Sequence, residues 1–324
     1  MKDYIIRTIK KKKGDNYIYE YHDKHHKRVS SSKTKRTLQN LYLPPALDHV
    51  HINTNQSEKV LAIGKDTKGR PQYTYNKRYT KKQTREKFKH MIKLGESYQK
   101  ILRKIQSDIY QEAETKDKQI AMVLRLVIDC SFRIGNEKYT RENKSYGVTT
   151  LESRHVRISG PQIKIKFRGK KGVMNECIFR NKKLSRNLRR KKHSLKNTDR
   201  IFTYRSKNNF FDIRPTDVNL YLKKFGDFTT KNFRTWCANI EFIHQLMKQS
   251  ELFLDISKGS RTKIINRCID NVAHKLHNTR SVCKSNYLDP NLLETALRFP
   301  NKLKPFRNCT TKDDYTREYI RFLK

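Results

Sequence analysis

Short segments of alternating apolar and polar residues characterise the first quarter of the chain. Their β-branched and aromatic content predicts strands at residues 49–52, 60–63 and 72–75. Residues 64–70 contain glycine and aspartate and are typical of a turn. Residues 25–32 look like a loop, and the adjacent prolines within residues 43–47 indicate a rigid connector. We therefore expect residues 1–83 to form a small, β-rich N-terminal domain.

A helical periodicity begins near Thr84. Apolar residues every three or four positions predict a core helix over residues 117–135, ended by Gly135. Residues 162–179 alternate around a Gly-Lys-Lys-Gly turn and predict a hairpin. The fold class expected is α+β, in which a mainly helical domain with a small antiparallel sheet, residues 84–324, follows the β-rich domain. Further helices are predicted over residues 85–111, 236–247 and 265–276.

The composition indicates a polyanionic partner. The 324 residues include 74 Lys and Arg against 31 Asp and Glu, which gives a formal net charge of +43. Such an excess destabilises a compact state unless polyanions offset it. Nucleic acid is the natural partner, since phosphate contacts release counterions and supply most non-specific affinity. A basic structural or ribosome-like protein would also fit the charge alone.

The six cysteines are scattered and form no Cys-x-x-Cys pair. This spacing argues against a zinc site and against a disulfide framework, and so predicts a reducing, intracellular compartment. The first residues lack the apolar stretch of a signal peptide. No run of apolar residues approaches the roughly 20 that a membrane span needs. A nucleus, nucleoid, viral factory or virion would each fit a DNA-associated protein of this kind.

Tyr287 is the first candidate for chemistry. A phenol, with a pKa of about 10, is a poor nucleophile until its proton leaves and nearby charge stabilises the oxygen. Arg133 and Arg234 are suited to the non-bridging oxygens of a phosphodiester, because a guanidinium stays charged and binds two oxygens at once. Each residue alone has a plain structural interpretation, as a packed tyrosine, a helix-end arginine or a surface arginine.

Three further residue types complete a set that could transfer a phosphodiester to tyrosine. Lys170, at the predicted hairpin turn, is a candidate general acid for the leaving 5′-oxygen, with Lys171 as its neighbour. Alone, it could equally be a solvated turn lysine. Asn278, nine residues before the tyrosine, and His277 could each donate a hydrogen bond to a non-bridging oxygen. Asn278 could instead simply end a helix.

These segments together resemble type IB DNA topoisomerases of the small poxvirus and bacterial kind, over nearly the whole chain. Residues 132–151 resemble the family's first arginine box, which also contains Lys138 and Tyr139. Residues 165–170 resemble its lysine hairpin, residues 231–236 its second arginine box, and residues 278–287 its nucleophile box. Poxvirus members carry His at the position of Asn278, whereas bacterial-type members carry Asn, so Asn278 is preferred and His277 is its rival. His277 also replaces a more usual glycine.

The resemblance implies a monomer whose two domains form a C-shaped clamp around supercoiled double-stranded DNA, with the catalytic fold shared by tyrosine recombinases. It implies that Tyr287 becomes joined to a 3′ phosphate, that the DNA swivels, and that the 5′-hydroxyl reseals the nick. The phosphotyrosine bond keeps the energy, so no ATP, metal or other cofactor is expected. The expected DNA-binding residues are Lys138 and Tyr139 with Lys68, Arg70, Gln72, Tyr73 and Tyr75.

Basic runs at residues 10–13 and 181–196 are heavier than is usual for the family and would add non-specific affinity. The second run is either a solvated arm or a DNA-contacting segment.

Two other functions compete with this hypothesis. A tyrosine recombinase or integrase uses the same chemistry as a tetramer, but usually has His three residues before the second arginine, where this chain has Lys231. That residue, a candidate auxiliary group in catalysis, favours the topoisomerase. A non-catalytic basic nucleic-acid-binding protein would explain the charge but not the four boxes.

Overall fold

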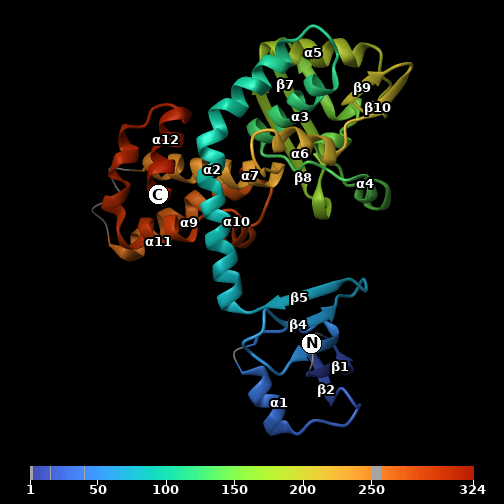
Figure 1. Cartoon of the computed structure of the whole chain (residues 1–324), viewed down its shortest axis with the longest axis vertical. Coiled ribbons are helices and arrows are strands. Elements are labelled where there is room, and N and C mark those ends of the chain that lie inside the picture. Colours follow the sequence, from blue (N-terminus) through green and yellow to red (C-terminus); the bar gives the residue numbers. More distant parts are fainter. Residues whose placement is uncertain (1–2, 15, 40, 250–256) are drawn as a thin grey trace. The chain divides into compact units, whose positions relative to one another are not determined.

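The computed structural model describes residues 3–14, 16–39, 41–249 and 257–324. Contacts divide the chain into two compact units, Met1–Lys87 and Phe88–Lys324. The division falls within helix α2 (Lys77–Tyr110), which begins earlier than the predicted residue 85. Figure 1 shows the elements of each unit.

The first unit is built on a five-stranded antiparallel sheet. One face buries Val50, Ile52 and Ala62 together with Leu43 and Leu47 of the proline-containing connector. The strands predicted at residues 49–52, 60–63 and 72–75 are β3, β4 and β5, so these predictions are confirmed. In spatial order the strands are β2 (Asn16–Asp23), β1 (Tyr4–Lys13), β3 (Asp48–Asn53), β4 (Val60–Lys65) and β5 (Pro71–Tyr75).

The expected loop over residues 25–32 is wrong at its end, because helix α1 (Ser31–Leu38) begins within it. Ser30 adopts extended backbone angles, and its side chain accepts a hydrogen bond from the amide of Lys33. The serine run therefore supplies an N-cap rather than a loop, as short hydroxyl side chains often do.

The second unit is mainly helical, with a three-stranded antiparallel sheet and a two-stranded hairpin. Its sheet is formed by β6 (Val156–Ser159), β7 (Gln162–Arg168) and β8 (Met174–Arg180), which confirms the predicted hairpin. The separate hairpin is β9 (Thr203–Ser206) and β10 (Asn209–Asp212). Short 3₁₀ helices are η1 (Val148–Thr150), η2 (Ser153–His155), η3 (Lys170–Gly172) and η4 (Pro300–Asn308).

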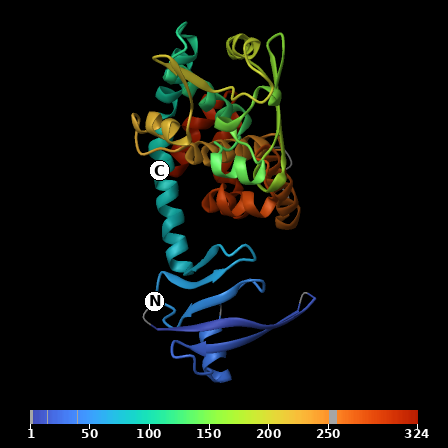
Figure 2. The same ribbon diagram turned by 90° about the vertical axis from the view of Figure 1, so that its right-hand side faces the viewer.

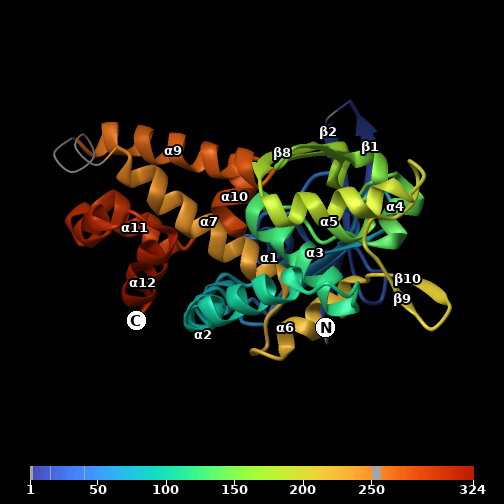
Figure 3. The same cartoon turned by 90° about the horizontal axis from the view of Figure 1, so that it is seen from above.

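Helix α3 (Lys116–Cys130) is buried along almost its whole length and lies at the centre of this unit. Figure 3 shows α7 (Thr230–Met247) and α9 (Lys258–Lys275) side by side, with α10 (Arg280–Asn286) at the end of α9. The predicted apolar spacings of α7 and α9 are confirmed. The other helices of the described residues are α4 (Glu137–Asn143), α5 (Lys182–His193), α6 (Pro215–Lys223), α11 (Pro290–Arg298) and α12 (Lys312–Leu323).

The central helix ends earlier than predicted. Ser131, at φ 53°, takes the left-handed conformation that ends α3, so residues 131–135 leave the helix. Gly135 instead meets Gly147: a β-carbon on Gly147 would lie 2.4 Å from the Gly135 nitrogen. The two glycines therefore allow close backbone contact between the segments that follow α3 and α4.

The basic run over residues 181–196 is not a solvated arm. Most of it forms α5, whose Leu184 and Leu188 are fully buried in the core of the unit. Asn181 caps the helix by accepting a hydrogen bond from the Leu184 amide. Throughout the described residues, each helix is too short or too polar to cross a bilayer.

Candidate active site

A turn at the end of α9 positions Asn278. The Asn278 amide donates to the Ala273 carbonyl at 2.9 Å, and the His277 amide donates to the His274 carbonyl at 3.0 Å. This pair of bonds is a Schellman motif, which needs one left-handed residue, here His277 at φ 51°. The His277 ring stacks on Phe132, with 5.5 Å between ring centroids. Burial, with Arg234 and Arg133 adding to it, lowers the pKa of His277 to about 4.

Arg133 and Asn278 contact each other directly. Arg133 Nη2 donates to Asn278 Oδ1 at 2.6 Å, across 145 residues of sequence. Asn278 Nδ2 is buried and has no hydrogen-bond partner in the described structure. A buried amide donor without a partner costs free energy, and such groups cluster where a ligand completes them. The pair therefore presents a guanidinium and an amide N–H that an anion could engage.

Arg234 and Tyr287 form a second direct contact. Arg234 Nη1 donates to Tyr287 Oη at 3.0 Å, and the guanidinium carbon lies 5.1 Å from the tyrosine ring centroid. The arginine is only 5% exposed, because Nε donates to the Ser131 carbonyl and Nη2 to the Leu276 carbonyl. Burial lowers its pKa to about 10, opposed by Tyr287 and reinforced by Arg133. It therefore remains a cation at neutral pH.

A buried asparagine fixes the main chain of Tyr287. Asn239 Nδ2 donates to the Tyr287 carbonyl at 2.9 Å, and Asn239 Oδ1 accepts from the Asp289 amide at 2.8 Å. The sequence reasoning missed this residue. The available signal was a polar side chain inside the apolar stretch of α7, since buried amides need partners.

Lys170 is exposed at the turn between β7 and β8. The hairpin is tied to the Arg133 segment through backbone bonds, because the Tyr146 amide donates to the Arg168 carbonyl and the Val148 amide to the Arg133 carbonyl. Within the described part of the chain, the Lys170 ammonium forms no hydrogen bond to the other four candidate side chains. Lys171, Lys231, Lys138 and Tyr139 are also exposed.

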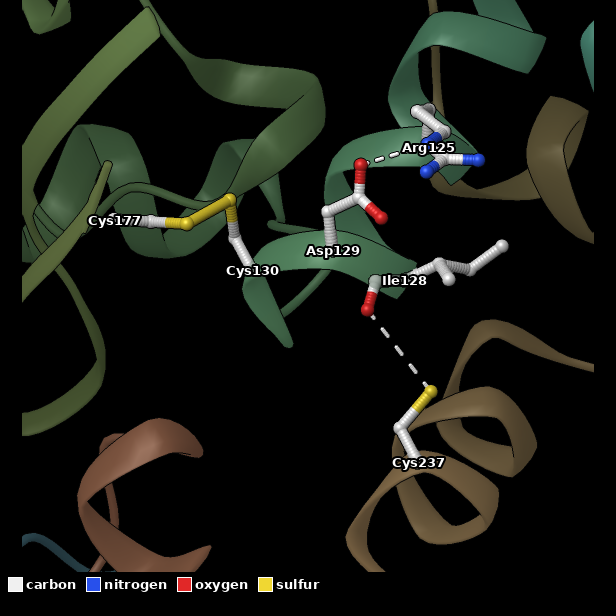
Figure 4. The surroundings of a disulfide bond; sticks show 6 residues. All are labelled: Arg125, Ile128, Asp129, Cys130, Cys177 and Cys237. Carbon is white, nitrogen blue, oxygen red and sulfur yellow. Dashed lines mark hydrogen bonds and ion pairs between the residues drawn. A yellow bond between two sulfur atoms is a disulfide. The ribbon is translucent and has the colours of Figure 1, made fainter. Parts of the chain in front are cut away.

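A disulfide, shown in Figure 4, joins α3, which ends three residues before Arg133, to β8, which follows the turn that carries Lys170. It links Cys130, the last residue of α3, to Cys177 in β8, with 5.7 Å between their α-carbons. The expectation that the cysteines form no disulfide is therefore wrong, because the fold brings the end of α3 next to β8 at two residues that lie 47 apart in sequence. Cysteine spacing consequently gives no support for a reducing compartment.

The expected DNA-reading residues lie on the β4–β5 turn and on β5, an edge strand of the first unit. Asp66 organises the turn: it accepts from the Lys68 amide and from the side chains of Arg70 and Gln72. Hydrogen bonds from the Arg70 side chain first, and then from the Arg70 and Lys68 amides, lower the pKa of Asp66 to about 2. Tyr73 and Tyr75 are 51% and 43% exposed and stack at 6.1 Å, so this edge offers donors and aromatic faces together.

Acidic, histidine and cysteine side chains of the described residues form no group that could hold a metal ion. The candidate side chains that the structure brings together are two pairs, Arg133 with Asn278 and Arg234 with Tyr287, and each pair contains a guanidinium.

Comparisons with known proteins give one consistent family. Residues 76–304 match the family described as eukaryotic DNA topoisomerase I, catalytic core. The DNA topoisomerase 1B of Acanthamoeba polyphaga mimivirus is 30% identical over 323 residues, covering 97% of this chain and 94% of that protein. The DNA topoisomerase 1B of vaccinia virus (strain Copenhagen) is 26% identical over 263 residues, covering 79% of this chain and 80% of that protein.

Proposed function

The chain belongs to the DNA topoisomerase I family and is a type IB DNA topoisomerase, and we propose that Tyr287 is the nucleophile with which it breaks one strand. The observation that carries this role is the hydrogen bond from buried Arg234 to the Tyr287 oxygen at 3.0 Å. Relatives named as topoisomerases favour this reaction over recombination.

In the proposed reaction, Tyr287 Oη attacks a backbone phosphorus and its proton passes to solvent water. The P–O5′ bond breaks, which leaves a 3′-phosphotyrosine and a 5′-hydroxyl. The strand swivels to relax supercoils, and attack by the 5′-hydroxyl restores the phosphodiester and frees the tyrosine. Bond energy is conserved in the phosphotyrosine, so the balance requires neither ATP nor a redox partner.

The other side chains take complementary roles in this proposal. Arg133, Arg234 and the free Asn278 amide stabilise the charge that grows on the non-bridging oxygens, where one such donor contributes about 3–4 kcal/mol. Lys170 protonates the leaving 5′-oxygen, because it lies on a turn tied to the Arg133 segment. Lys231, exposed on the first turn of α7, is an auxiliary cation near Arg234 in sequence.

We further infer a monomer in which an N-terminal domain, residues 1–83, and a catalytic domain, residues 84–324, close as a clamp around duplex DNA. The catalytic domain would have the fold shared with tyrosine recombinases. Lys68, Arg70, Gln72, Tyr73 and Tyr75 on one domain, and Lys138 and Tyr139 on the other, would contact the duplex. As a DNA-acting enzyme, the protein works inside the cell in association with DNA.

The direct test of this function is relaxation of supercoiled plasmid in EDTA without ATP. We expect complete relaxation by the purified chain. Bound but unrelaxed plasmid would contradict the proposed mechanism and favour a binding protein.

Asn278→Asp tests which residue at the α9 turn meets the phosphate. Aspartate keeps the acceptor for Arg133 but replaces the free N–H donor with negative charge, so we expect single-turnover cleavage to slow by about 10²–10³-fold. The control is His277→Gly, which suits the left-handed backbone and should change cleavage by no more than about threefold. If His277→Gly slows cleavage strongly and Asn278→Asp does not, then His277 is the residue that donates to the phosphate.

Arg70→Ala tests the β4–β5 turn. Loss of one duplex contact should weaken DNA affinity on the order of tenfold or shift the cleavage sites, without stopping the chemistry. The measurement is a binding titration with a cleavage map of one long duplex. Arg36→Ala, an exposed arginine on α1, is the matched control. Unchanged affinity and an unchanged map for Arg70→Ala would count against the role.

A further inference from the structure

The β1–β2 hairpin ends in a lysine-rich tip that the proposed reaction does not use. Residues 10–13 are four consecutive lysines, all exposed, at the end of β1. Figure 2 shows β1 and β2 reaching past the ends of the other strands of the first unit. β2 is one edge of this sheet and β5 is the other, so the tip is separate from the expected DNA-reading edge.

A bulge gathers the lysines on one face of the hairpin. The register shifts between Ile9 and Lys11, after which Lys11 pairs with Ile18 and Lys13 with Asn16. Paired residues share a face, and alternate residues of β2 share it too. Lys10 forms an ion pair with Glu20 at 2.6 Å, and Glu20 is on that same face of β2. Because a bulge offsets the alternation, Lys10, Lys11 and Lys13 lie on this face and Lys12 lies on the other.

The opposite face stacks cations on aromatic rings. Lys12 Nζ lies 5.5 Å from the Tyr17 centroid, Tyr17 stacks on Tyr19 at 6.2 Å, and Arg7 lies 4.4 Å over Tyr19. These stacked contacts stiffen a hairpin that extends away from the core, since a cation is attracted to the face of an aromatic ring. Ile18, 56% exposed, lies among the lysines and offers an apolar surface.

We propose that this hairpin tip, with Lys11, Lys13 and Ile18 on one face and Lys12 beside Tyr17 on the other, is a second duplex-DNA contact that binds the phosphate backbone without reading sequence. The inference rests on the proposed DNA-relaxing function and adds an anchor to it. A row of lysines on a rigid strand follows a polyanion, whereas base reading would call for planar, bidentate side chains. Glu20 already pairs with Lys10, so it does not compete with phosphates for Lys11 and Lys13 on the same face.

The test replaces Lys11, Lys12 and Lys13 with threonine, which favours strands and removes three charges. Binding to a duplex is measured in the Tyr287→Phe background, so that cleavage does not contribute, between 50 and 200 mM salt. We expect the slope of log affinity against log salt to become shallower by about 2 to 3, and affinity at 50 mM to fall about tenfold or more. Single-turnover cleavage at saturating enzyme, with Tyr287 restored, should stay unchanged.

The matched control changes Lys33, Lys35 and Arg36 on α1 to glutamine, which removes the same charge from exposed positions of the same unit. Its slope should stay near that of the parent. If both variants lose affinity and salt slope equally, the effect reflects net charge alone and the proposal is overturned. It is also overturned if the threonine variant loses affinity only for single-stranded DNA and not for the duplex. If the triple variant fails to fold, Lys13→Thr alone should lower the slope by about 1, and arginine at all three positions should preserve it.

The outcomes distinguish failure of the hairpin-tip contact from failure of the proposed DNA-relaxing function. A parent chain that fails to relax plasmid contradicts the proposed function. A parent that relaxes plasmid while the threonine variant keeps its full salt slope contradicts only the hairpin contact.

Discussion

Replacing Tyr287 with phenylalanine should abolish relaxation and covalent attachment while leaving DNA binding intact. The side chain is 8% exposed, and the phenylalanine ring would fill the same space. Only the hydroxyl and its bond from Arg234 are lost, which costs about 1 kcal/mol of stability. Loss of the nucleophile should lower the cleavage rate on the order of 10⁴-fold or more. The measurement is transfer of a 3′-phosphoryl label from a suicide duplex to protein.

A second tyrosine provides the control. Tyr315 is 7% exposed in the same unit, outside the contacts that join Arg133, Arg234, Asn278 and Tyr287. Tyr315→Phe should therefore keep full labelling. Labelled protein from the Tyr287→Phe variant would assign the nucleophile to another residue.

Local sequence patterns predicted helices and strands well where burial of one side of the element alone determined the pattern. The apolar spacing of α7 and α9 and the alternation of β7 are set by burial on one side, and these elements formed as expected. The end of α3 was mispredicted because Ser131, not a glycine, took the left-handed conformation. The sequence alone assigned Gly135 to a helix end. In the structure, the close backbone contact with Gly147 explains why a glycine stands at this position.

The long-range contacts of the site could not be read from spacing. Local sequence marked Arg133, Arg234, Asn278 and Tyr287 as candidates, but not that Arg133 would bond Asn278 across 145 residues or Arg234 would bond Tyr287 across 53. The Cys130–Cys177 disulfide was missed for the same reason, since its partners lie 47 residues apart in sequence and meet only in the folded chain.

Arg234 carries more structural contacts than a surface arginine, which makes its variants informative. Its guanidinium donates to Ser131, Leu276 and Tyr287, and so joins the ends of α3 and α9 to the tyrosine. Alanine would leave two buried carbonyls without a donor, at about 1–3 kcal/mol each, and remove one cation from the reacting phosphate. We expect single-turnover cleavage to fall at least about 10²–10³-fold.

Arg234→Lys separates the charge from the geometry. Lysine keeps a cation but cannot make three bonds in a fixed plane, so cleavage should stay well below that of the parent while exceeding the alanine variant. Rates are measured well below each variant's unfolding midpoint, because both substitutions also destabilise the fold. Arg317→Ala, which removes an exposed arginine paired with Asp314, should change neither rate nor midpoint appreciably. If Arg234→Ala loses stability but cleaves at the parent rate, then the guanidinium only supports the turn that holds Asn278.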